Sequence, residues 1–539
     1  MVAGSGGARY DCIVVGGGHN GLVCATYLAR GGRSVLVLEA ADEVGGAAVT
    51  REFAPGFRVS ACAHLLHSMS GSMIRDLRLE EYGLTFAARQ MPTVALSEDG
   101  GSLALGESVA FRGSFSTGET SVTALEWGAM GDDAAAHLGY VALLNRFAQA
   151  LRPMLDSVPP RLGTNTWADK RALLQLGWQV RRLGREDMRE LLRIGGMNVY
   201  DLLKEHFQSP LLQGALGFDA VLGSNFGPRS PGSVFTLLYR LAAAYESGGA
   251  PLSQPTGGLG SLSRALAAAA VAAGAEVRTK AVVQRITVQN HRASGVQLTS
   301  GETIGADTVI SNVDPQATFL RLLGTEYLDA GFARRVSHLR TRGLTAKMHL
   351  ALDDLPRFTS VSDEALGSRF LIAPSLEYLE RAFNHSKYGE FSNAPAIEIT
   401  LPTVNDPALA PSGKHVLSAV VQYAPYTLKN EWDQGRQQFA EIIVDTIERY
   451  SPGLGKSIIS AQLLTPADIE REFRITGGHW HHAELALDQF FMMRPVPGAA
   501  QYQTPVDGLY LCGAGCHPGG GVMGTAGRNA ARQVLGQAA

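Results

Sequence analysis

Three glycines near the start of the sequence have the spacing of a phosphate-binding turn. Gly16, Gly18 and Gly21 fit the pattern GxGxxG, which follows an apolar segment at 11–15 and precedes a helical segment at 22–30. The first glycine permits a sharp bend, the second lets backbone N–H groups approach a pyrophosphate, and the third lets the helix pack closely. The helix N-terminus also favours negative charge. The pattern predicts a dinucleotide site, with Asn20 inside the turn.

An acidic residue follows at the position that suits a ribose. The next apolar segment, 34–38, ends at Glu39, 18 residues after Gly21. A carboxylate there can accept hydrogen bonds from ribose hydroxyls. Strand, turn, helix and strand thus form one βαβ opening, which does not by itself distinguish NAD from FAD.

Histidines are the other residues that could do chemistry. His479, His481 and His482 share one loop with Trp480, but neither an i, i+4 pair nor a cysteine cluster completes a metal site. We therefore expect no metal, and interpret the loop as polar cavity lining with His482 as a candidate catalytic residue. His64 and His67 could be bases, although histidines of the core or of loops are commoner.

Composition excludes several classes of function. The 539 residues carry 47 basic and 50 acidic side chains, a net charge of -3, so nothing draws the chain onto nucleic acid. No apolar run is long enough to span a bilayer and no signal peptide is evident, while peripheral membrane contact stays open. Five cysteines without a CxxC pair favour structural thiols in a reducing, cytoplasmic setting, and no disulphide-reductase pair.

The rest of the chain alternates between two kinds of pattern. Residues 132–245 are helical, including 134–155, 170–183 and 185–205, and are interpreted as an inserted cap. Further expected elements are a helix at 262–273, strands at 276–279, 281–289, 295–299, 303–311, 347–352, 396–401 and 416–421, a helix at 432–450, a strand at 508–512 and a helix from about Gly521. The strands from 276 to 311 are expected to return the chain to the first sheet.

The C-terminal segment from Gly508 to Ala530, GLYLCGAGCHPGGGVMGTAGRNA, is the most specific feature. It resembles the closing flavin motif of the phytoene-desaturase-like branch of the flavin amine oxidase superfamily. The resemblance implies FAD as cofactor. It places Val522 and Met523 against the flavin ring at a helix start near Gly521, and Gly513 and Ala514 at the phosphate and ribityl part. Ala514 stands where many relatives carry an acidic residue.

The same resemblance implies roles elsewhere in the chain. Gly45 and Gly46 correspond to a second glycine motif beside the ribityl and pyrophosphate portion, and the backbone at Val283 to an adenine contact. Lys347 lies where the superfamily places a strand lysine that holds a water near flavin N5, and a surface lysine is the alternative. Lys347 and His482 are the expected catalytic residues.

The predicted fold is α/β, with a discontinuous Rossmann-like FAD-binding domain, a mixed-sheet substrate domain and a helical cap. The expected FAD-binding segments are 1–125, 251–325 and 496–539; the cap spans 126–250 and the substrate domain 326–495. The resemblance implies desaturation of a carbon–carbon bond in an apolar, lipid- or polyene-like substrate by hydride transfer to flavin N5, with oxygen or a quinone as electron acceptor. Amine oxidation to an imine and hydrogen peroxide, isomerisation by reduced flavin, and an FAD-binding interaction protein without turnover remain alternatives. Oligomeric state is not indicated.

Overall fold

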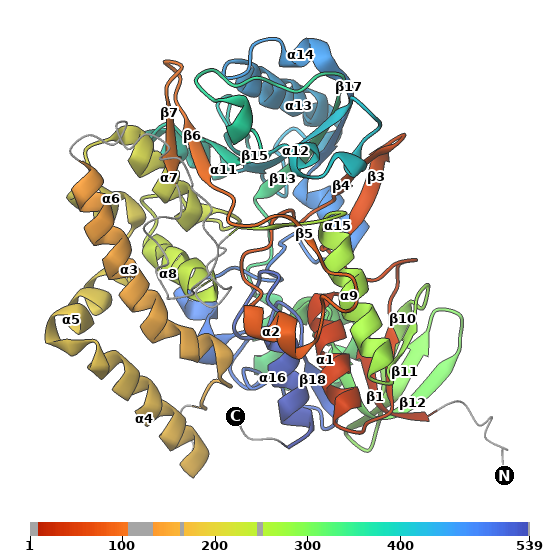
Figure 1. Cartoon of the computed structure of the whole chain (residues 1–539). Coiled ribbons are helices and arrows are strands. Elements are labelled where there is room, and N and C mark those ends of the chain that lie inside the picture. Colours follow the sequence, from red (N-terminus) through yellow and green to blue (C-terminus); the bar gives the residue numbers. More distant parts are fainter. Residues whose placement is uncertain (1–8, 106–132, 162–165, 245–251, 537–539) are drawn as a thin grey trace.

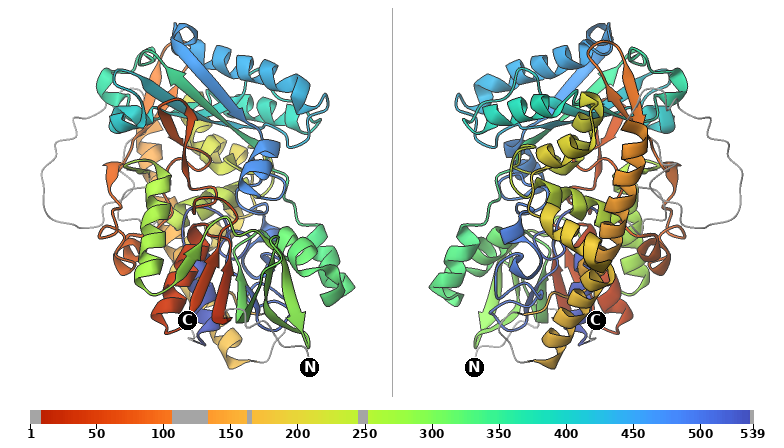
Figure 2. Two further views of the ribbon diagram at one scale, coloured as in Figure 1. Left: turned by 90° about the vertical axis from the view of Figure 1, so that its right-hand side faces the viewer. Right: turned by 90° about the vertical axis from the view of Figure 1, so that its left-hand side faces the viewer.

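The structure is a computed structural model that describes residues 9–105, 133–161, 166–244 and 252–536. Within these ranges, no helix has both the length and the hydropathy needed to cross a membrane. The domain boundaries expected at residues 125 and 250 lie outside the described residues. Two sheets lie at opposite ends of the molecule, with a layer of helices along one side (Figures 1 and 2).

The first sheet gathers strands from distant parts of the chain. Its order is β10 (Val283–Gln289), β11 (Arg292–Leu298), β12 (Thr303–Ser311), β1 (Arg9–Val15), β2 (Val35–Leu38) and β9 (Glu276–Arg278), and β18 (Leu509–Leu511) pairs with β12. β1 runs parallel to β12 and β2, whereas β10, β11 and β12 are antiparallel neighbours. The predicted discontinuous Rossmann-like domain is therefore confirmed.

Three helices cover this sheet because its central strands are apolar on both faces. All four residues of β2, Val-Leu-Val-Leu, are buried, as is typical of a parallel strand covered from both sides. The covering helices are α1 (His19–Arg30), α9 (Leu259–Ala272) and α16 (Thr525–Val534). Leu22, Leu266 and Ala530 from these helices belong to the same buried core as the strands.

The second sheet is mixed, as predicted. Its order is β17 (Ile458–Leu464), β13 (Thr345–Leu352), β16 (His415–Gln422), β15 (Ala396–Thr400), β14 (Arg369–Ile372), β6 (Thr93–Leu96) and β7 (Ser102–Leu105). Strands β13, β14 and β15 are buried along their whole length. The helices that follow or join its strands are α11 (Leu376–Ser386), α12 (Pro402–Asn405), α13 (Trp432–Glu448), α14 (Leu454–Ser457) and α15 (Pro466–Phe473).

Within the described residues, the expected cap contains six helices. They are α3 (Asp133–Asp156), α4 (Trp167–Arg182), α5 (Gly184–Ile194), α6 (Val199–His206), α7 (Pro210–Val221) and α8 (Ser233–Ala244). The single helix expected over 185–205 is wrong. Gly195 and Gly196 end α5, and Asn198 caps α6 by accepting from the Asp201 N–H.

Smaller elements connect these layers. They are β3 (Thr50–Ala54), β4 (Phe57–Ser60), α2 (Gly71–Asp76), β5 (Phe86–Ala88), β8 (Gln254–Pro255) and α10 (Ala330–Ser337). The last helix also differs from expectation, because α16 begins at Thr525 rather than near Gly521. Gly521 and Gly524 have φ of 111° and 76°, so the chain stays in a loop until residue 524.

The contact between α1 and α16 gives a test of this packing. A Cβ at Gly527 would lie 2.0 Å from the Asn20 carbonyl oxygen and 3.1 Å from the Cys24 nitrogen. We expect Gly527→Ala to lower the free energy of unfolding by roughly 1–3 kcal/mol, because neither backbone can yield without moving its helix. Chemical denaturation measures this change.

Gly139→Ala is the matched control, since Gly139 lies within α3 with no atom within 4 Å of an added Cβ. That change should raise stability by up to about 1 kcal/mol through helix propensity. Equal effects of the two substitutions would contradict the close approach of α1 and α16.

Candidate active site

A cavity of about 590 Å³ lies between the two sheets and the cap helices, and all three parts supply residues to its wall. The sequence-predicted residues that line it come from both ends of the chain and from the middle. They are Gly16, Gly18, Asn20, Glu39, Gly45, Gly46, Val283, His482, Ala514, Gly521 and Val522. The structure thus brings most of the expected site residues together around one space.

Four expected site residues do not line the cavity and lie behind the residues that do. A Cβ at Gly21 would approach the Gly16 carbonyl oxygen to 2.3 Å, and one at Gly513 would approach the Asn312 oxygen to 2.5 Å. These two glycines therefore allow close backbone packing. Met523 packs in the apolar cluster with Tyr239 and Phe490, beside the cavity-lining Val522. Lys347 is buried in β13.

The glycine turn has the open space and the free donors that a pyrophosphate requires. Gly18 is the N-cap of α1 and supplies no side-chain cap, so the first N–H groups of the helix have no side-chain acceptor there. Gly18 pairs with Gly45, and Gly46 adopts φ of 59°, where the nearest atom to an added Cβ would be Gly18 Cα at 3.6 Å. These residues fit the phosphate portion of a dinucleotide.

Glu39 is held in place by the backbone on either side of it. Its Oε2 accepts from the Gly17 N–H at 2.7 Å, and its Oε1 accepts from the Ala41 N–H at 2.8 Å. Each carboxylate oxygen can accept a further hydrogen bond. Glu39 lines the cavity, so the carboxylate fits the expected role towards a ribose while also fixing the glycine turn.

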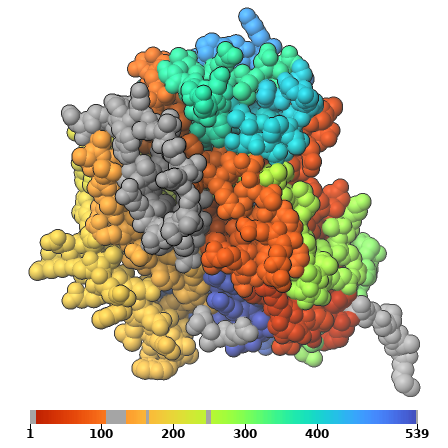
Figure 3. All heavy atoms as spheres, viewed as in Figure 1, coloured from red at the N-terminus to blue at the C-terminus, as the bar shows by residue number. Residues whose placement is uncertain are grey.

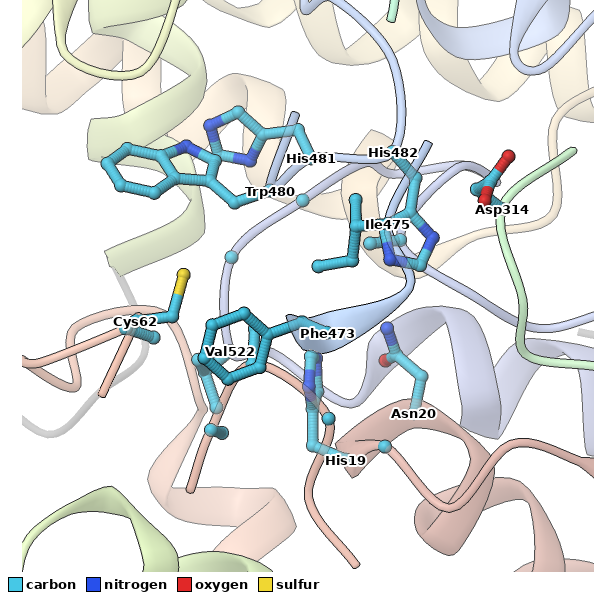
Figure 4. Close-up of a pocket in the computed structure, with 18 of the residues that line it drawn as sticks. His19, Asn20, Cys62, Asp314, Phe473, Ile475, Trp480, His481, His482 and Val522 are labelled. Carbon is cyan, nitrogen blue, oxygen red and sulfur yellow. The ribbon is translucent and has the colours of Figure 1, made fainter. Parts of the chain in front are cut away.

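Two histidines that line the cavity each have one ring nitrogen without a partner among the described residues. His19 Nε2 and His482 Nδ1 are buried and have no hydrogen-bond partner among the described residues. Burial lowers the pKa of each ring to about 4; the neighbouring His482 lowers that of His19 further, and Asp314 only partly opposes the shift of His482. Figure 4 shows the side chains of His19 and Asn20 extending from the start of α1, and that of His482 pointing towards them from a separate loop. Neutral rings with unused nitrogen atoms fit the polar edge of a flavin.

A chain of buried polar groups forms the wall on the second sheet. Lys347 Nζ lies 3.0 Å from His64 Nδ1 and donates to Ser418 Oγ at 3.1 Å. His64 Nε2 in turn lies 2.6 Å from Glu398 Oε1. His64 and Glu398 line the cavity, whereas Lys347 does not. The alternative of a surface lysine is wrong, and Lys347 contacts the cavity through His64.

This series of polar contacts continues to the cap helices through Arg369 of β14. Arg369 donates to Glu398 Oε2 through Nε, and to both oxygens of Asp219 at 2.6 and 3.2 Å. Beyond Asp219, the guanidinium of Arg240 in α8 lies 3.6 Å away. Asp219, Arg240 and Glu398 all line the cavity. We call Lys347, His64, Glu398, Arg369, Asp219 and Arg240 the buried network.

Burial and neighbouring charges set the protonation of this network. Burial lowers the pKa of Lys347 to about 8, opposed by Cys62 and Glu398, and lowers that of His64 to about 4, assisted by Lys347. Burial alone would raise the pKa of Glu398 and Asp219, but Arg369 outweighs it and holds both below their usual values. At neutral pH both carboxylates are therefore ionised, His64 is neutral and Lys347 is mostly protonated.

The sequence did not point to Asp219, Arg240, Arg369 or Glu398. They come from α7, α8, β14 and β15, so only the tertiary fold brings them together. One local signal was available: Glu398 and Arg369 interrupt the otherwise apolar strands Ala-Ile-Glu-Ile-Thr and Arg-Phe-Leu-Ile. A charge within a buried strand requires a partner.

Neither a cluster of potential metal ligands nor a disulphide is found among the described residues. No group of three or more histidine, cysteine or acidic side chains among the described residues could hold a metal ion. The five cysteines are buried and free, and burial raises the pKa of Cys512 and Cys516. Thiols in that state are poor nucleophiles and are consistent with a structural role.

The chain is similar to known proteins both in sequence and in fold. Residues 21–535 match the family described as "Flavin containing amine oxidoreductase". The chain is 36% identical to "Pyridine nucleotide-disulfide oxidoreductase domain-containing protein 2" of Mus musculus, over 98% of this chain and 93% of that protein. It is 26% identical to "Phytoene desaturase (lycopene-forming)" of Pseudescherichia vulneris, over 95% of this chain and 96% of that protein.

Solved structures share the fold at low sequence identity. An oxidoreductase from Methanosarcina mazei superposes with a TM-score of 0.59 and 18% identity, covering 98% of this chain and all of that one. The predicted combination of a Rossmann-like domain and a mixed sheet is thus found in other proteins of this type.

The position of Glu39 generates a test of the dinucleotide end. In Glu39→Gln, the amide NH₂ must replace one of the two oxygens that accept from Gly17 and Ala41, so one N–H donor faces another donor. Losing one charge-assisted hydrogen bond is worth about 1.5–3 kcal/mol, and we expect the dissociation constant for FAD to rise at least about tenfold. Titration of the apoprotein by flavin fluorescence measures it.

Glu43→Gln is the control, because this acid lies four residues further on and forms an ion pair with Arg51, at 3.8 Å. Its FAD affinity should match that of the unaltered protein. An unchanged affinity in Glu39→Gln would show that the carboxylate does not shape the dinucleotide site.

Proposed function

The chain belongs to the flavin-containing amine oxidoreductase family and its cofactor is FAD, and from this premise we propose that it dehydrogenates a carbon–carbon bond of an apolar, lipid- or polyene-like substrate. The observation that carries the proposal is the apolar part of the cavity wall. Apolar side chains there come from the cap and from the loops around it: Leu65, Leu222, Leu252, Trp480 and Leu485. A wall of this kind favours an apolar molecule and excludes water.

The same wall is unsuited to an amine. An ammonium group is normally held by a carboxylate or an aromatic cage. The carboxylates of Asp219 and Glu398 are both engaged by Arg369, and Glu398 also contacts His64. Amine oxidation to an imine and hydrogen peroxide therefore ranks second, below desaturation.

In the proposed reaction, two adjacent carbons each lose one hydrogen. FAD, when bound, would supply the hydride acceptor for the first hydrogen, with oxygen or a quinone as the final acceptor of the two electrons. The second hydrogen leaves as a proton, and the electron pair of its C–H bond forms the new double bond. We assign the acceptance of this proton to His482, whose neutral ring lines the cavity with Nδ1 free of partners among the described residues.

Lys347 has an indirect role in this proposal. Its Nζ is held by His64 and Ser418, so it orients the His64 ring and supplies positive charge behind the cavity wall. Cys62, His349 and Glu398 are the other titratable groups that influence it or lie beside it. Lys347 is therefore a positioning residue, and His482 the group that meets the substrate.

Anaerobic mixing of the FAD-loaded protein with candidate substrates tests the proposal. We expect bleaching of the flavin absorbance with members of a panel of polyenes, terpenes and long-chain lipids, and no hydrogen peroxide in air with an amine panel. His482→Asn, which tolerates the φ of 60° at this position, should slow bleaching roughly 100-fold without loss of FAD.

His338→Asn, in an exposed position, is the control and should bleach at the original rate. If amines are the only compounds turned over, the reaction is amine oxidation and the desaturation proposal is wrong. A flavin that dithionite reduces but no organic compound reduces would instead favour an FAD-binding interaction protein.

The outer face of α4 carries exposed apolar side chains, which suit a protein whose proposed substrate is apolar. Trp167, Leu174 and Trp178 are 77%, 69% and 65% exposed, and at about 100° per residue they fall on one line along the helix. Lys170, Arg171, Arg181 and Arg182 flank that line. Leu176 and Val180 pack against the protein from the opposite side. Figure 3 shows α4 and α5 at the outer edge of the molecule.

We propose that this face of α4 contacts an anionic membrane surface. Tryptophan and leucine enter the interface between headgroups and acyl chains, while flanking lysine and arginine contact anionic headgroups. The exposed side chains and their flanking charges are the support for peripheral contact, and Asp169, the acid of this helix, is buried on its other side.

Vesicle sedimentation tests this contact. The protein should sediment with vesicles that contain phosphatidylserine and much less with phosphatidylcholine alone. Trp167→Gln combined with Trp178→Gln should weaken binding at least about tenfold, because two interfacial aromatic rings are lost. Tyr388→Gln, at an equally exposed aromatic residue outside the cap, should have no effect. Self-association through α4, or binding that ignores lipid charge, would contradict the proposal.

A further inference from the structure

Arg240 is the cation of the buried network with the weakest contact to a carboxylate. Its side chain reaches the cavity wall from α8 and is 21% exposed. Within the described residues it makes no hydrogen bond, and its ion pair with Asp219 spans 3.6 Å between Nε and Oδ1, too long for a hydrogen bond. The guanidinium carries five N–H donors in a fixed fork, and these remain available towards the cavity.

The network also carries more positive than negative charge. Lys347, Arg369 and Arg240 are its cations, and Asp219 and Glu398 are its carboxylates. Both carboxylates contact Arg369 in the middle of the network. The extra positive charge is therefore carried by the two cations at its ends. One end is Lys347, which is buried behind His64, and the other is Arg240 at the cavity. A buried charge without a partner is costly.

A second unused polar group lies near Arg240. His67 lines the cavity and makes no hydrogen bond to any residue that the structure describes. Burial and then the charge of Arg240 lower the pKa of His67 to about 3, so the ring is neutral and retains one N–H donor. Leu222 and Leu252 line the same cavity with apolar surface.

We infer that the substrate is an amphipathic acid, an apolar chain or ring that bears one carboxylate, and that Arg240 binds the carboxylate while His67 donates a further hydrogen bond. This inference rests on the proposed function, because it concerns the substrate of the same cavity. The planar fork of a guanidinium pairs with two carboxylate oxygens at once. One bound carboxylate brings the charge of the network to zero.

Other charged groups fit the site less well. A phosphate monoester carries nearly two negative charges and would leave the network with an excess of negative charge. An ammonium group would add to the positive surplus. A substrate without any polar group would desolvate the Arg240 guanidinium and leave it only the 3.6 Å ion pair with Asp219, at the cost of its hydration.

Equilibrium binding to the FAD-loaded protein tests the inference without requiring turnover. The probes are octanoate, oleate, cinnamate and retinoate, each compared with its methyl ester and its alcohol, and oleyl phosphate is included. Perturbation of the flavin spectrum and titration calorimetry report binding. We expect at least one acid to bind more tightly than its own ester and alcohol, and more tightly than the phosphate in the oleyl series.

Substitution of Arg240 then identifies the anchor. Arg240→Met should weaken binding of the acid roughly tenfold to a hundredfold and leave the ester within about threefold, as expected for loss of a charge-assisted pair. Arg240→Lys should fall in between, because it keeps the charge but not the fork. Arg335→Met, an exposed arginine of α10, is the control. FAD content and melting temperature verify that each variant folds.

The possible outcomes distinguish binding of a carboxylate by Arg240 from the proposed desaturation. If an acid binds through Arg240 but does not bleach the flavin anaerobically, the anchor stands and desaturation fails. If a neutral polyene bleaches the flavin equally in Arg240→Met and the unaltered protein, desaturation stands and the anchor is overturned. Failure of every acid to bind better than its ester also overturns the inference.

Discussion

The site depends on one junction at the carboxyl ends of the parallel strands, where Asn312 joins three parts of the chain. The Asn312 backbone N–H donates to the Val15 carbonyl at 2.8 Å, and its side-chain Nδ2 donates to the Gly16 carbonyl at 3.2 Å. One residue earlier, Ser311 accepts from the Cys512 N–H at 2.8 Å. The N-terminal glycine turn, the returning strand and the C-terminal loop are therefore fixed against each other by backbone contacts.

That junction explains why so many glycines are required there. Gly21 would place a Cβ 2.3 Å from the Gly16 oxygen, and Gly513 would place one 2.5 Å from the Asn312 oxygen. Neither position needs to touch the cofactor to be essential, because each allows two backbones to meet. The dinucleotide end of the cavity is built mainly from backbone, with Glu39 as the side chain that braces it.

This difference in construction decides what the sequence could predict. The turn at Gly16–Gly21 and the strand that ends at Glu39 are local patterns whose spacing indicated the Rossmann-like sheet. The closing loop around Val522 is also local, and the family resemblance that it carries implied FAD. Helix ends were less predictable: Gly195 and Gly196 divide one expected helix, and the positive φ of Gly524 delays the last one. Arg240, Asp219, Arg369 and Glu398 had no common local pattern, since helices and strands up to 179 residues apart meet only in the folded protein.

The substrate end follows a different physical rule from the dinucleotide end. Its polar groups are long side chains from α7, α8, β14 and β15, and each is held by its neighbours rather than by the backbone. Removing Arg369 from the middle of the network leaves the buried Glu398 and the half-buried Asp219 without their main cation, whereas removing Arg240 breaks only one long ion pair. Change at that end can therefore alter which substrate is held while the flavin end and the fold stay the same. On our proposal that Arg240 holds the substrate, this cation is the position at which a substitution changes substrate preference while the dinucleotide end stays intact.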